Sequence, residues 1–367
     1  MSAHDTIFAP SFGNRPSMLV GRSALIARIV KGLESAPGSR DRAVLLLGQR
    51  GSGKTVLLWE LADRMRKTGF VVANPTIVSE DLLPRIVEKV ADDADLSPKR
   101  HVSGGSVGAL GFTAGLQLQQ VPEIAKSRQQ QLTELCRELT DKGKGVLFLI
   151  DELQANSPEL RQFIITYQEL VGERLNVALV MAGLPGAVSE TLNDKVLTFL
   201  NRAPRITLDP LAFGDVDAFY RQSFERLGLS ITPDLRRRAA ECTAGSPYML
   251  QLVGHNIARY AEPDGKVTES CLADALETSR TDFENDVCRT TLAALSEKDV
   301  EFLDALAQDG EEASMGAIAE RMDVTPDYAQ KYRRRLIDGG IIEAAGRGRV
   351  RMAVPYLADH LRKELGR

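Results

Sequence analysis

The sequence has few of the residues that mark metal-bound or disulfide-bonded proteins. Its 367 residues include four cysteines, four histidines and one tryptophan. The cysteines are Cys136, Cys242, Cys271 and Cys288. They lie far apart, form no CxxC pair and have no histidine at metal-ligand spacing, so we expect neither a zinc site nor a disulfide framework. Dispersed cysteines favour buried, reduced thiols in a cytoplasmic protein.

Long hydrophobic segments and an excess of one charge are also missing. The N-terminal residues contain no basic segment followed by an apolar run, and the apolar stretches elsewhere are too short to span a bilayer. We therefore expect neither secretion nor a membrane span. Forty-six basic residues stand against fifty acidic ones, for a formal charge of −4. Contact with nucleic acid would therefore need a local basic patch.

The remaining composition is that of an ordinary globular protein. Hydrophobic residues make up 43% of the chain and charged residues 26%, which excludes collagen-like, coiled-coil and wholly disordered chains. A chain of 367 residues is long enough for two or three domains. We expect boundaries that divide it into residues 1–208, 209–287 and 288–367.

The first of these segments alternates short apolar runs with helical patterns. Strands are predicted at residues 43–47, 70–73, 146–150, 177–181 and 205–208. Helices are predicted between them, one ending at Gly69 and another at Pro158–Val171. This alternation predicts an α/β domain with a parallel sheet. Residues 101–118 are rich in Gly and Ser with alternating apolar residues, which predicts an inserted hairpin or a loop.

The second and third segments follow different patterns. Residues 215–285 are predicted to be mainly helical. From about residue 295 onward, three helices are predicted to begin after the caps Ser296, Ser314 and Thr325. Two strands are predicted next, at residues 341–343 and 349–354. Three helices followed by a hairpin predict a winged helix-turn-helix domain.

Residues 48–55, which we term the phosphate loop, read GQRGSGKT and satisfy the pattern GxxxxGK[ST]. Glycines let the backbone N–H groups of such a loop surround phosphates, and the next helix directs its N-terminus toward their charge. Lys54 is expected on the β- and γ-phosphates and Thr55 on Mg²⁺. The residues expected to contact ATP or ADP here are Gly48, Gln49, Arg50, Gly51, Ser52, Gly53, Lys54, Thr55 and Val56. The alternative is a chance match, against which the flanking strand and helix argue.

Two carboxylates, Asp151 and Glu152, follow the predicted strand at residues 146–150. A buried apolar strand gains no stability from carboxylates at its end. The carboxyl end of a parallel strand lies on the same side of the sheet as the phosphate loop. We therefore expect Asp151 to hold Mg²⁺ and Glu152 to orient and polarise an attacking water. The alternative is that the pair only begins the next loop.

Together with the helical region and the winged helix, three motifs resemble AAA+ ATPases: the phosphate loop, LFLIDE at residues 147–152, and Leu19-Val20-Gly21-Arg22. The resemblance is strongest to the origin-recognition-like branch and to the related STAND and archaeal-type ATPases. It implies a P-loop parallel-sheet core followed by a helical lid and a winged helix.

Two segments match details of this group. In relatives, the segment that matches Arg22 packs near the adenine, although STAND proteins have an Arg-Glu pair and here Ser23 follows Arg22. The segment around Pro247 is similar to the GxP signature of STAND lids, where this proline lies against the nucleotide. The alternatives are an ordinary turn at Arg22 and an ordinary helix start at Pro247.

The resemblance also places residues that would tune hydrolysis. The first sensor of the family should fall near Met181-Ala182-Gly183, whose last two positions offer no polar side chain, and no arginine lies between Gly245 and Gln251 to act as a second sensor. These departures imply slow hydrolysis. Arg202, with Arg205 nearby, occupies the region of a trans-acting arginine finger, which would act only in an oligomer. A surface arginine without a role is the alternative.

The predicted winged helix has a local excess of positive charge, with seven basic and three acidic residues from 326 to 352. The predicted core positions of its last helix are Ala329, Tyr332 or Arg333, Leu336 and Ile337. The predicted DNA contacts are Lys331, Arg334 and Arg335 on the helix, and Arg347 and Arg349 on the wing. Aromatic side chains are not expected on this patch, so single-strand stacking is not predicted. The alternative is a set of solvated arginines on a protein-binding domain.

Three functions fit these expectations. The first is an ATP-binding, slowly hydrolysing molecular switch whose nucleotide state positions the winged helix on double-stranded DNA or on a protein partner. The second is an origin-recognition-like replication initiator or helicase loader that acts as a homo-oligomer. The third is a nucleotide-gated transcription regulator without hydrolysis, which the weak first sensor favours and Glu152 opposes.

Overall fold

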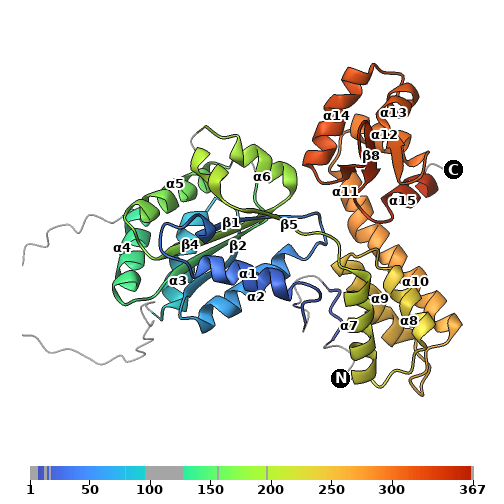
Figure 1. Cartoon of the computed structure of the whole chain (residues 1–367), viewed down its shortest axis with the longest axis horizontal. Helices are drawn as coiled ribbons and strands as arrows, with labels where there is room; N and C mark the ends of the chain where they lie inside the picture. The colour runs from blue at the N-terminus through green and yellow to red at the C-terminus, as the bar shows by residue number, and fades with distance from the viewer. Residues whose placement is uncertain are drawn as a thin grey trace, which may run out of the picture.

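The structure is a computed structural model that describes residues 7–11, 15, 18–78, 80–95, 127–154, 157–195 and 197–364. The hairpin or loop predicted at residues 101–118 lies outside the described residues. Within the described ranges, no helix combines the length and the apolar character needed to cross a membrane. Figure 1 shows a layered domain on one side of the molecule and a tall helical column on the other.

The layered domain, which we term the core domain, contains a five-stranded parallel sheet. Its strands are β1 (Ala43–Leu47), β2 (Val71–Ile77), β3 (Val146–Asp151), β4 (Val177–Gly183) and β5 (Arg205–Thr207). Their order across the sheet is β2-β3-β4-β1-β5. All five predicted strands are present, with ends shifted by up to four residues. Because β1 and β4 lie side by side, Leu47 and Gly183 pair at their carboxyl ends.

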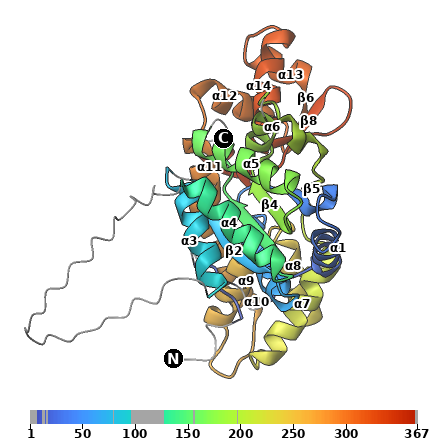
Figure 2. The ribbon, with the colours of Figure 1, turned by 90° about the vertical axis from the view of Figure 1, so that its left-hand side faces the viewer.

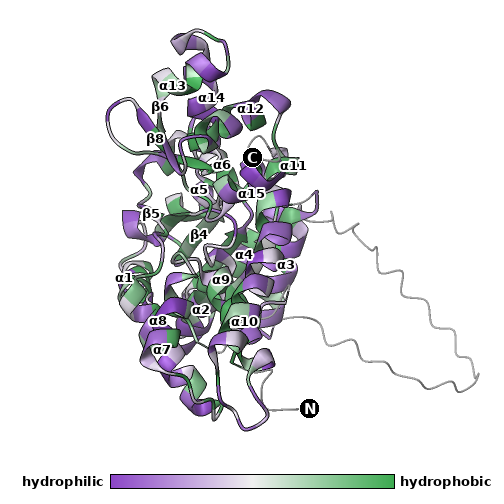
Figure 3. Cartoon of the chain, turned by 90° about the vertical axis from the view of Figure 1, so that its right-hand side faces the viewer, coloured by the Kyte–Doolittle hydropathy of each residue, from purple (hydrophilic) through white to green (hydrophobic). Residues whose placement is uncertain are grey.

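Helices cover both faces of this sheet, as Figure 2 shows. They are α1 (Ser23–Leu33), α2 (Lys54–Lys67), α3 (Leu82–Asp93), α4 (Arg128–Asp141), α5 (Pro158–Gly172) and α6 (Pro185–Leu192), with short turns η2 (Arg40–Arg42) and η3 (Thr198–Arg202). The apolar side chains of α1 and α2 pack on one face, and those of α3, α4 and α5 on the other. Figure 3 shows the hydrophobic β4 enclosed by helices with hydrophilic outer faces.

The lower part of the column is the lid, a bundle of four helices. They are α7 (Phe213–Arg226), α8 (Pro233–Glu241), α9 (Pro247–Tyr260) and α10 (Glu269–Phe283). The N-terminal segment packs against this bundle: Phe8 is 2% exposed, and its ring lies 5.8 Å from those of Phe219 and Phe224. The backbone N–H of Ala9 donates to Gln251 at 2.9 Å. The lid therefore includes residues from both sides of the core domain in sequence.

The upper part of the column is the C-terminal unit. Its elements are the π-helical turn η4 (Glu284–Arg289), α11 (Thr290–Ala293), α12 (Glu297–Ala307), β6 (Glu312–Ser314), α13 (Met315–Arg321), α14 (Pro326–Asp338), β7 (Ile342–Ala344), β8 (Arg349–Met352) and α15 (Leu357–Glu364). Ser296, Ser314 and Thr325 cap α12, α13 and α14 as predicted. The antiparallel sheet has the order β6-β8-β7. This is a winged-helix arrangement, to which the structure adds β6 and α15, which the sequence patterns did not predict.

The lid and the C-terminal unit join without a linker. The helix α10 continues through η4 into α11 as one helical segment from Glu269 to Ala293, so the boundary predicted at residues 287/288 falls inside a helix. One continuous cluster of buried apolar side chains also fills both parts. Among the described residues, this cluster contains no buried side chain from the strands or helices of the core domain. The column is therefore a single packed body, which we term the arm.

Candidate functional site

The phosphate loop lies between β1 and α2, at the carboxyl edge of the sheet. Gly51 and Gly53 have φ angles of +73° and +86°, a region that favours glycine, and Gly53 forms the N-cap of α2. Lys54 turns back over the loop, where its Nζ donates to the carbonyl oxygens of Gly48 at 2.8 Å and Gln49 at 2.7 Å. The loop thus forms a closed turn around an ammonium group at the N-terminus of a helix.

Burial changes the protonation of this lysine. Loss of solvent lowers the pKa of Lys54 to about 8, an effect that the carboxylates of Asp151 and Glu152 oppose only in part. A phosphate that binds at the loop would add negative charge and stabilise the ammonium form further. The lowered pKa therefore fits a lysine that waits for an anionic ligand.

The two carboxylates lie where β3 ends, next to the loop. Asp151 is 5% exposed, and its Oδ2 accepts a hydrogen bond from the Thr55 hydroxyl at 2.6 Å. Glu152 is exposed and has a φ of +50°, which directs it out of the strand path. Positive φ is uncommon for residues other than glycine and collects at functional sites. The structure thus brings Lys54, Thr55, Asp151 and Glu152 together, as the sequence predicts.

This donor set fits a nucleotide with a divalent cation. The Ser52 hydroxyl is buried and has no hydrogen-bond partner among the described residues, as expected of a group meant for a ligand. Hard cations such as Mg²⁺ prefer oxygen ligands and bind through few protein groups together with substrate phosphates. The hydroxyl of Thr55 and the carboxylate of Asp151 are such groups, while Gly51 and Gly53 leave room for close backbone approach.

The end of β4, where the first sensor is expected, lies beside the phosphate loop. The backbone N–H of Gly48 donates to the carbonyl of Gly183 at 3.3 Å, so β4 ends directly beside the phosphate loop. A Cβ added at Gly183 would lie 2.9 Å from the Cβ of Leu153. A side chain at position 183 would therefore clash with Leu153.

Arg22, expected near the adenine, contacts the connection between the core domain and the lid. It is the N-cap of α1, and its guanidinium donates to the carbonyl of Asp209. Burial lowers the pKa of Arg22. The preceding Gly21 has a φ of +65° and lies against Asp215 of α7. The segment thus lies at the entry to the arm.

The lid meets the phosphate loop through the first residues of α9. A Cβ added at Gly53 would lie 3.7 Å from the Pro247 side chain, and one added at Gly51 would lie 3.3 Å from the Cβ of Tyr248. The Tyr248 hydroxyl donates to Asp286 in η4 at 2.6 Å. Burial raises the pKa of Tyr248, and the Asp286 carboxylate adds to this rise. Pro247 thus lies beside the loop, and Tyr248 is a neighbour to which sequence reasoning gave no role.

The C-terminal unit also reaches the loop, a contact that sequence reasoning missed. A Cβ added at Gly340 would lie 3.4 Å from Gln49 and 3.2 Å from Pro185. A Cβ added at Gly186 would lie 2.5 Å from the backbone oxygen of Asp338. The adjacent glycines 339 and 340 were interpreted only as a helix end, although they also allow close approach. The end of α14 therefore packs on α6 and on the phosphate loop.

The predicted arginine finger lies away from this cluster of side chains. Arg202 is exposed at the end of η3. Arg205 is on the edge strand β5, where its guanidinium donates to Asn201 at 3.1 Å. Neither residue belongs to the group around Lys54 and Asp151, so a role for Arg202 in hydrolysis would need a second molecule.

The predicted DNA-contact residues divide into two groups. Lys331, Arg334 and Arg347 are exposed. In contrast, the guanidinium of Arg335 donates to Asp299 and to Ser296 at 2.6 Å. Asp299 is 2% exposed and completes the capping box of α12. Arg335 is thus also exposed but is paired with a buried carboxylate of the unit, and its contact with DNA stays a prediction.

The wing and the aromatic residues also differ from the expectation. Arg349 pairs with Glu312, which reduces its free charge. Ala329, Tyr332 and Leu336 are buried as predicted. Tyr328, however, is 42% exposed, and its ring lies 5.2 Å from that of Tyr332. The expectation of a patch without aromatic side chains is therefore wrong, because an exposed aromatic ring stands at the start of α14.

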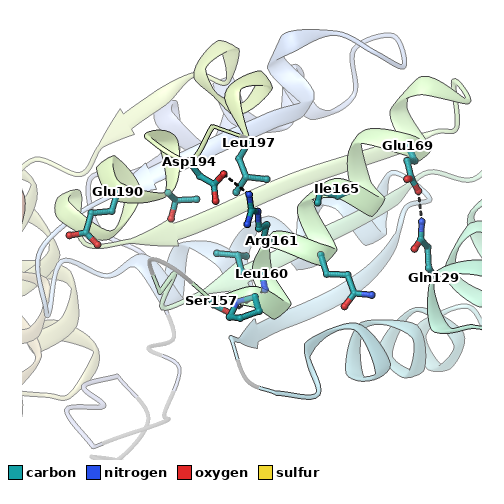
Figure 4. Close-up of a pocket in the computed structure, with 12 residues that line it drawn as sticks. Gln129, Ser157, Leu160, Arg161, Ile165, Glu169, Glu190, Asp194 and Leu197 are labelled. Atoms are coloured by element: carbon teal, nitrogen blue, oxygen red, sulfur yellow. Dashed lines mark hydrogen bonds and ion pairs between the residues drawn. The ribbon is translucent and has the colours of Figure 1, made fainter.

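A separate groove of about 530 Å³ lies on the outer face of α5, away from the phosphate loop. In Figure 4, Arg161 reaches across it to Asp194, while Gln129 and Glu169 are joined at its other end. Leu160 and other apolar side chains form part of its lining. These groups are paired across the groove, and nothing in their arrangement points to a reaction.

Comparisons with known proteins agree with this geometry. Residues 18–180 match the family model described as an AAA ATPase domain, and residues 285–361 match a domain of unknown function, DUF8462. No curated protein matches the chain.

Several solved structures have a similar fold. A Walker-type ATPase of Pyrococcus abyssi is 16% identical, with a TM-score of 0.66 and coverage of 95% of this chain and 97% of that one. The ORC2 protein of Aeropyrum pernix, solved in ADPNP–ADP complexes, is 17% identical, with a TM-score of 0.66 and 98% coverage of both chains. Cdc6p of Pyrobaculum aerophilum is 16% identical, with a TM-score of 0.50 and 98% coverage of both chains.

These findings agree on the identity of the fold. The strand order, the phosphate loop and the acidic end of β3 are those of a P-loop parallel-sheet domain, and the lid and winged-helix arrangement complete the likeness to the ORC and Cdc6 structures. Residues 18–180 match the model of an AAA ATPase domain, and the fold of the chain is similar to those of the ORC2 and Cdc6p structures.

Proposed function

We propose that this chain is an ATP-dependent molecular switch, in which the nucleotide at the phosphate loop sets the position of the arm. The observation that carries the proposal is the seam at the loop, where Tyr248 of the lid packs on Gly51 and Gly340 of the C-terminal unit packs on Gln49. A ligand in the loop therefore adjoins both parts of the arm. Such a ligand shifts the arm to the extent that it binds two arm positions with different affinity.

The chemistry at the loop supports hydrolysis of the bound ATP. Lys54 would hold the β- and γ-phosphates, and Glu152 would orient and polarise the attacking water. Thr55 and Asp151 would hold Mg²⁺, which neutralises charge on the phosphates when bound. Because the packing at Gly183 leaves no room for a polar sensor, we expect hydrolysis to be slow. The ADPNP–ADP complexes of the Aeropyrum pernix ORC2 protein support nucleotide binding by this fold.

The C-terminal unit is proposed to carry the output, on duplex DNA or on a protein partner. Lys331, Arg334 and Arg347 are the exposed cations that would contact phosphates. From Glu297 to Glu364, however, the unit has fourteen acidic and eleven basic residues. DNA binding would therefore depend on the local face of α14 and not on the charge of the whole unit.

A second candidate is an origin-recognition-like initiator that works as an oligomer. The fold similarity to the ORC2 and Cdc6p structures over 98% of each chain favours it. The exposed Arg202 would then complete the site of a neighbouring molecule. This candidate requires that turnover rise with protein concentration, whereas an isolated switch does not.

The test is ATP binding and turnover by the wild type, Lys54→Ala and Glu152→Gln, each with and without duplex DNA. A switch with hydrolysis predicts that Lys54→Ala loses binding, and that Glu152→Gln binds ATP but turns over at least about a hundredfold more slowly. Equal turnover by the wild type and Glu152→Gln would contradict hydrolysis and favour the regulator without hydrolysis. A dependence on Arg202 and on protein concentration would favour the oligomeric initiator.

A further inference from the structure

The joint between the lid and the C-terminal unit carries an inference that rests on the proposed switch and goes beyond it. There are two places at which an arm moved by nucleotide binding can hinge. The first lies between the core domain and the lid, at residues 208–212, and the second lies between the lid and the C-terminal unit. The contacts at the two places differ enough to decide between them.

The second place is held by a cluster around Tyr356, which belongs to the C-terminal unit. The Tyr356 hydroxyl donates to the backbone oxygen of Cys242, the residue that ends α8 in the lid. The guanidinium of Arg280, on α10 of the lid, lies 4.6 Å from the Tyr356 ring centre and pairs with Asp359 of α15. A single tyrosine is thus held from two lid helices.

The backbone of Tyr356 is itself evidence of tight constraint. Its φ is +62°, which is a rare outlier for a bulky residue and persists only where surrounding contacts hold it. Its ring meets Phe283 edge to face at 6.0 Å, and Phe283 is 1% exposed. The strained residue therefore fills a position in the shared apolar core of the arm.

Contacts within the C-terminal unit hold η4, which continues directly from α10 of the lid, against the segment around α15. Glu284 in η4 accepts from Lys363 at 2.6 Å and lies 3.6 Å from the buried His360. The Cys288 thiol donates to the carbonyl of Pro355 at 3.7 Å. The π-helical turn is therefore held on one side by α15. Turns of this kind inside α-helices are frequent at functional sites.

The first place is lightly held by comparison. The chain crosses from β5 to α7 through residues 208–212, where Arg22 holds the carbonyl of Asp209. The other contacts of the arm with the core domain include the glycine seams at Gly51, Gly53, Gly186 and Gly340. Among the described residues, no salt bridge given for the structure joins the two sides of these seams, and the buried residues of the apolar cluster of the arm do not cross them.

We propose that Tyr356 is a positioning residue that joins the lid and the C-terminal unit into one lever, so that nucleotide-driven motion hinges at residues 208–212 and carries both parts together. The nucleotide would contact the lid and the C-terminal unit at the loop, and the two parts would move together because Tyr356, Arg280 and Asp359 fix one to the other. Loss of this joint would leave nucleotide binding intact and would separate the two motions.

The test compares Tyr356→Phe with Tyr220→Phe. Tyr356→Phe removes one hydroxyl but keeps the ring beneath Arg280. Tyr220→Phe removes a tyrosine hydroxyl that donates to a backbone oxygen, that of Leu250, at 2.9 Å within the lid. Tyr220 lies near Cys242 and Tyr356, but its hydroxyl bonds within the lid, so this variant controls for the loss of a buried hydroxyl beside the joint. Asp359→Asn is a second variant of the joint, for use if Tyr356→Phe does not fold.

Amide hydrogen exchange is measured on the full chain without nucleotide, with ADP and with a non-hydrolysable ATP analogue. It follows two contacts with the phosphate loop separately: that of the lid at residues 247–252, the lid seam, and that of the C-terminal unit at residues 338–341. In the wild type, exchange is expected to change with nucleotide by about tenfold both at residues 247–252 and at residues 338–341. In Tyr356→Phe, the lid seam should still respond and the response at 338–341 should fall below about twofold, at unchanged nucleotide affinity. Tyr220→Phe should behave like the wild type at both seams.

The outcomes separate this inference from the proposed function. A wild type that binds nucleotide without a response at either seam overturns the switch, and the lever with it. A wild type that responds only at residues 247–252 overturns the lever alone. A Tyr356→Phe variant that responds at both seams, or equal losses in Tyr356→Phe and Tyr220→Phe, also overturns the lever alone.

Discussion

The core domain and the arm bury their apolar side chains in different ways. The core domain has two separate clusters, one on each face of the sheet, and the sheet itself forms the wall between them. The arm has one cluster that runs through the lid and the C-terminal unit. A domain boundary drawn from motifs would place three units in the chain, whereas the packing gives two. The site lies on the seam between these two bodies, where small residues meet.

The largest effect is expected when a buried side chain is removed where the lid and the C-terminal unit meet. Phe283→Ala should destabilise the arm by about 3–5 kcal/mol, because a fully buried aromatic ring leaves a cavity. The loss should appear in the lid and in the C-terminal unit together, as measured by hydrogen exchange under native conditions. Phe163→Ala, in the core domain, is the matched control and should leave the arm unchanged. Loss of protection confined to the lid would contradict a single packed body.

A smaller effect is expected at the seam between the C-terminal unit and the core domain. Gly186→Ala suits α6, since alanine favours a helix more than glycine does. Its Cβ would nevertheless lie 2.5 Å from the backbone oxygen of Asp338. We expect the seam to open at a cost of about 1–3 kcal/mol, with faster exchange at residues 338–341 and an unchanged melting of the core domain. Unchanged exchange there would show that α14 does not depend on this contact.

The sequence alone predicts the features that depend on neighbouring residues, and it does not predict contacts between distant parts of the chain. The phosphate loop, the acidic end of β3 and the caps Ser296 and Ser314 could be predicted, because each depends on a short, local pattern of residues. The contact of Gly340 with Gln49 could not, because it joins positions almost three hundred residues apart. The engagement of Arg335 by Asp299 was missed for the same reason, since a helix pattern does not reveal a partner on another element.

Titration of Lys54 should make ATP binding depend on pH. Burial lowers the pKa of Lys54 to about 8, below its usual value of 10.5. The free protein therefore loses this charge as the pH rises through about 8, and a phosphate must then bind without it or with uptake of a proton. ATP affinity should fall about tenfold between pH 7 and pH 9, as measured by titration calorimetry. Lys54→Arg keeps its charge in this range, so any binding that it retains should vary little with pH.

The same titration of Lys54 affects folding in the opposite direction to ATP binding. Between about pH 8 and the unfolded value of 10.5, the unfolded chain binds more protons at Lys54 than the folded one, so stability without nucleotide should rise with pH through this window. A flat affinity from pH 7 to pH 9 would contradict a buried, titrating Lys54.

The smallest expected effect separates two kinds of cation within the arm. Lys331→Ala removes an exposed charge, and if α14 meets DNA phosphates, affinity should fall uniformly across sequences and the slope of log affinity against log salt should decrease by about one. Arg335→Ala should instead lower the stability of the C-terminal unit, because Asp299 would remain buried at 2% exposure without its partner. Fluorescence anisotropy at several salt concentrations, with thermal melting in parallel, distinguishes the two. If Arg335→Ala changed the salt slope and left stability intact, the engagement of Arg335 within the unit would be wrong, and α14 would present a wider basic face than the structure gives it.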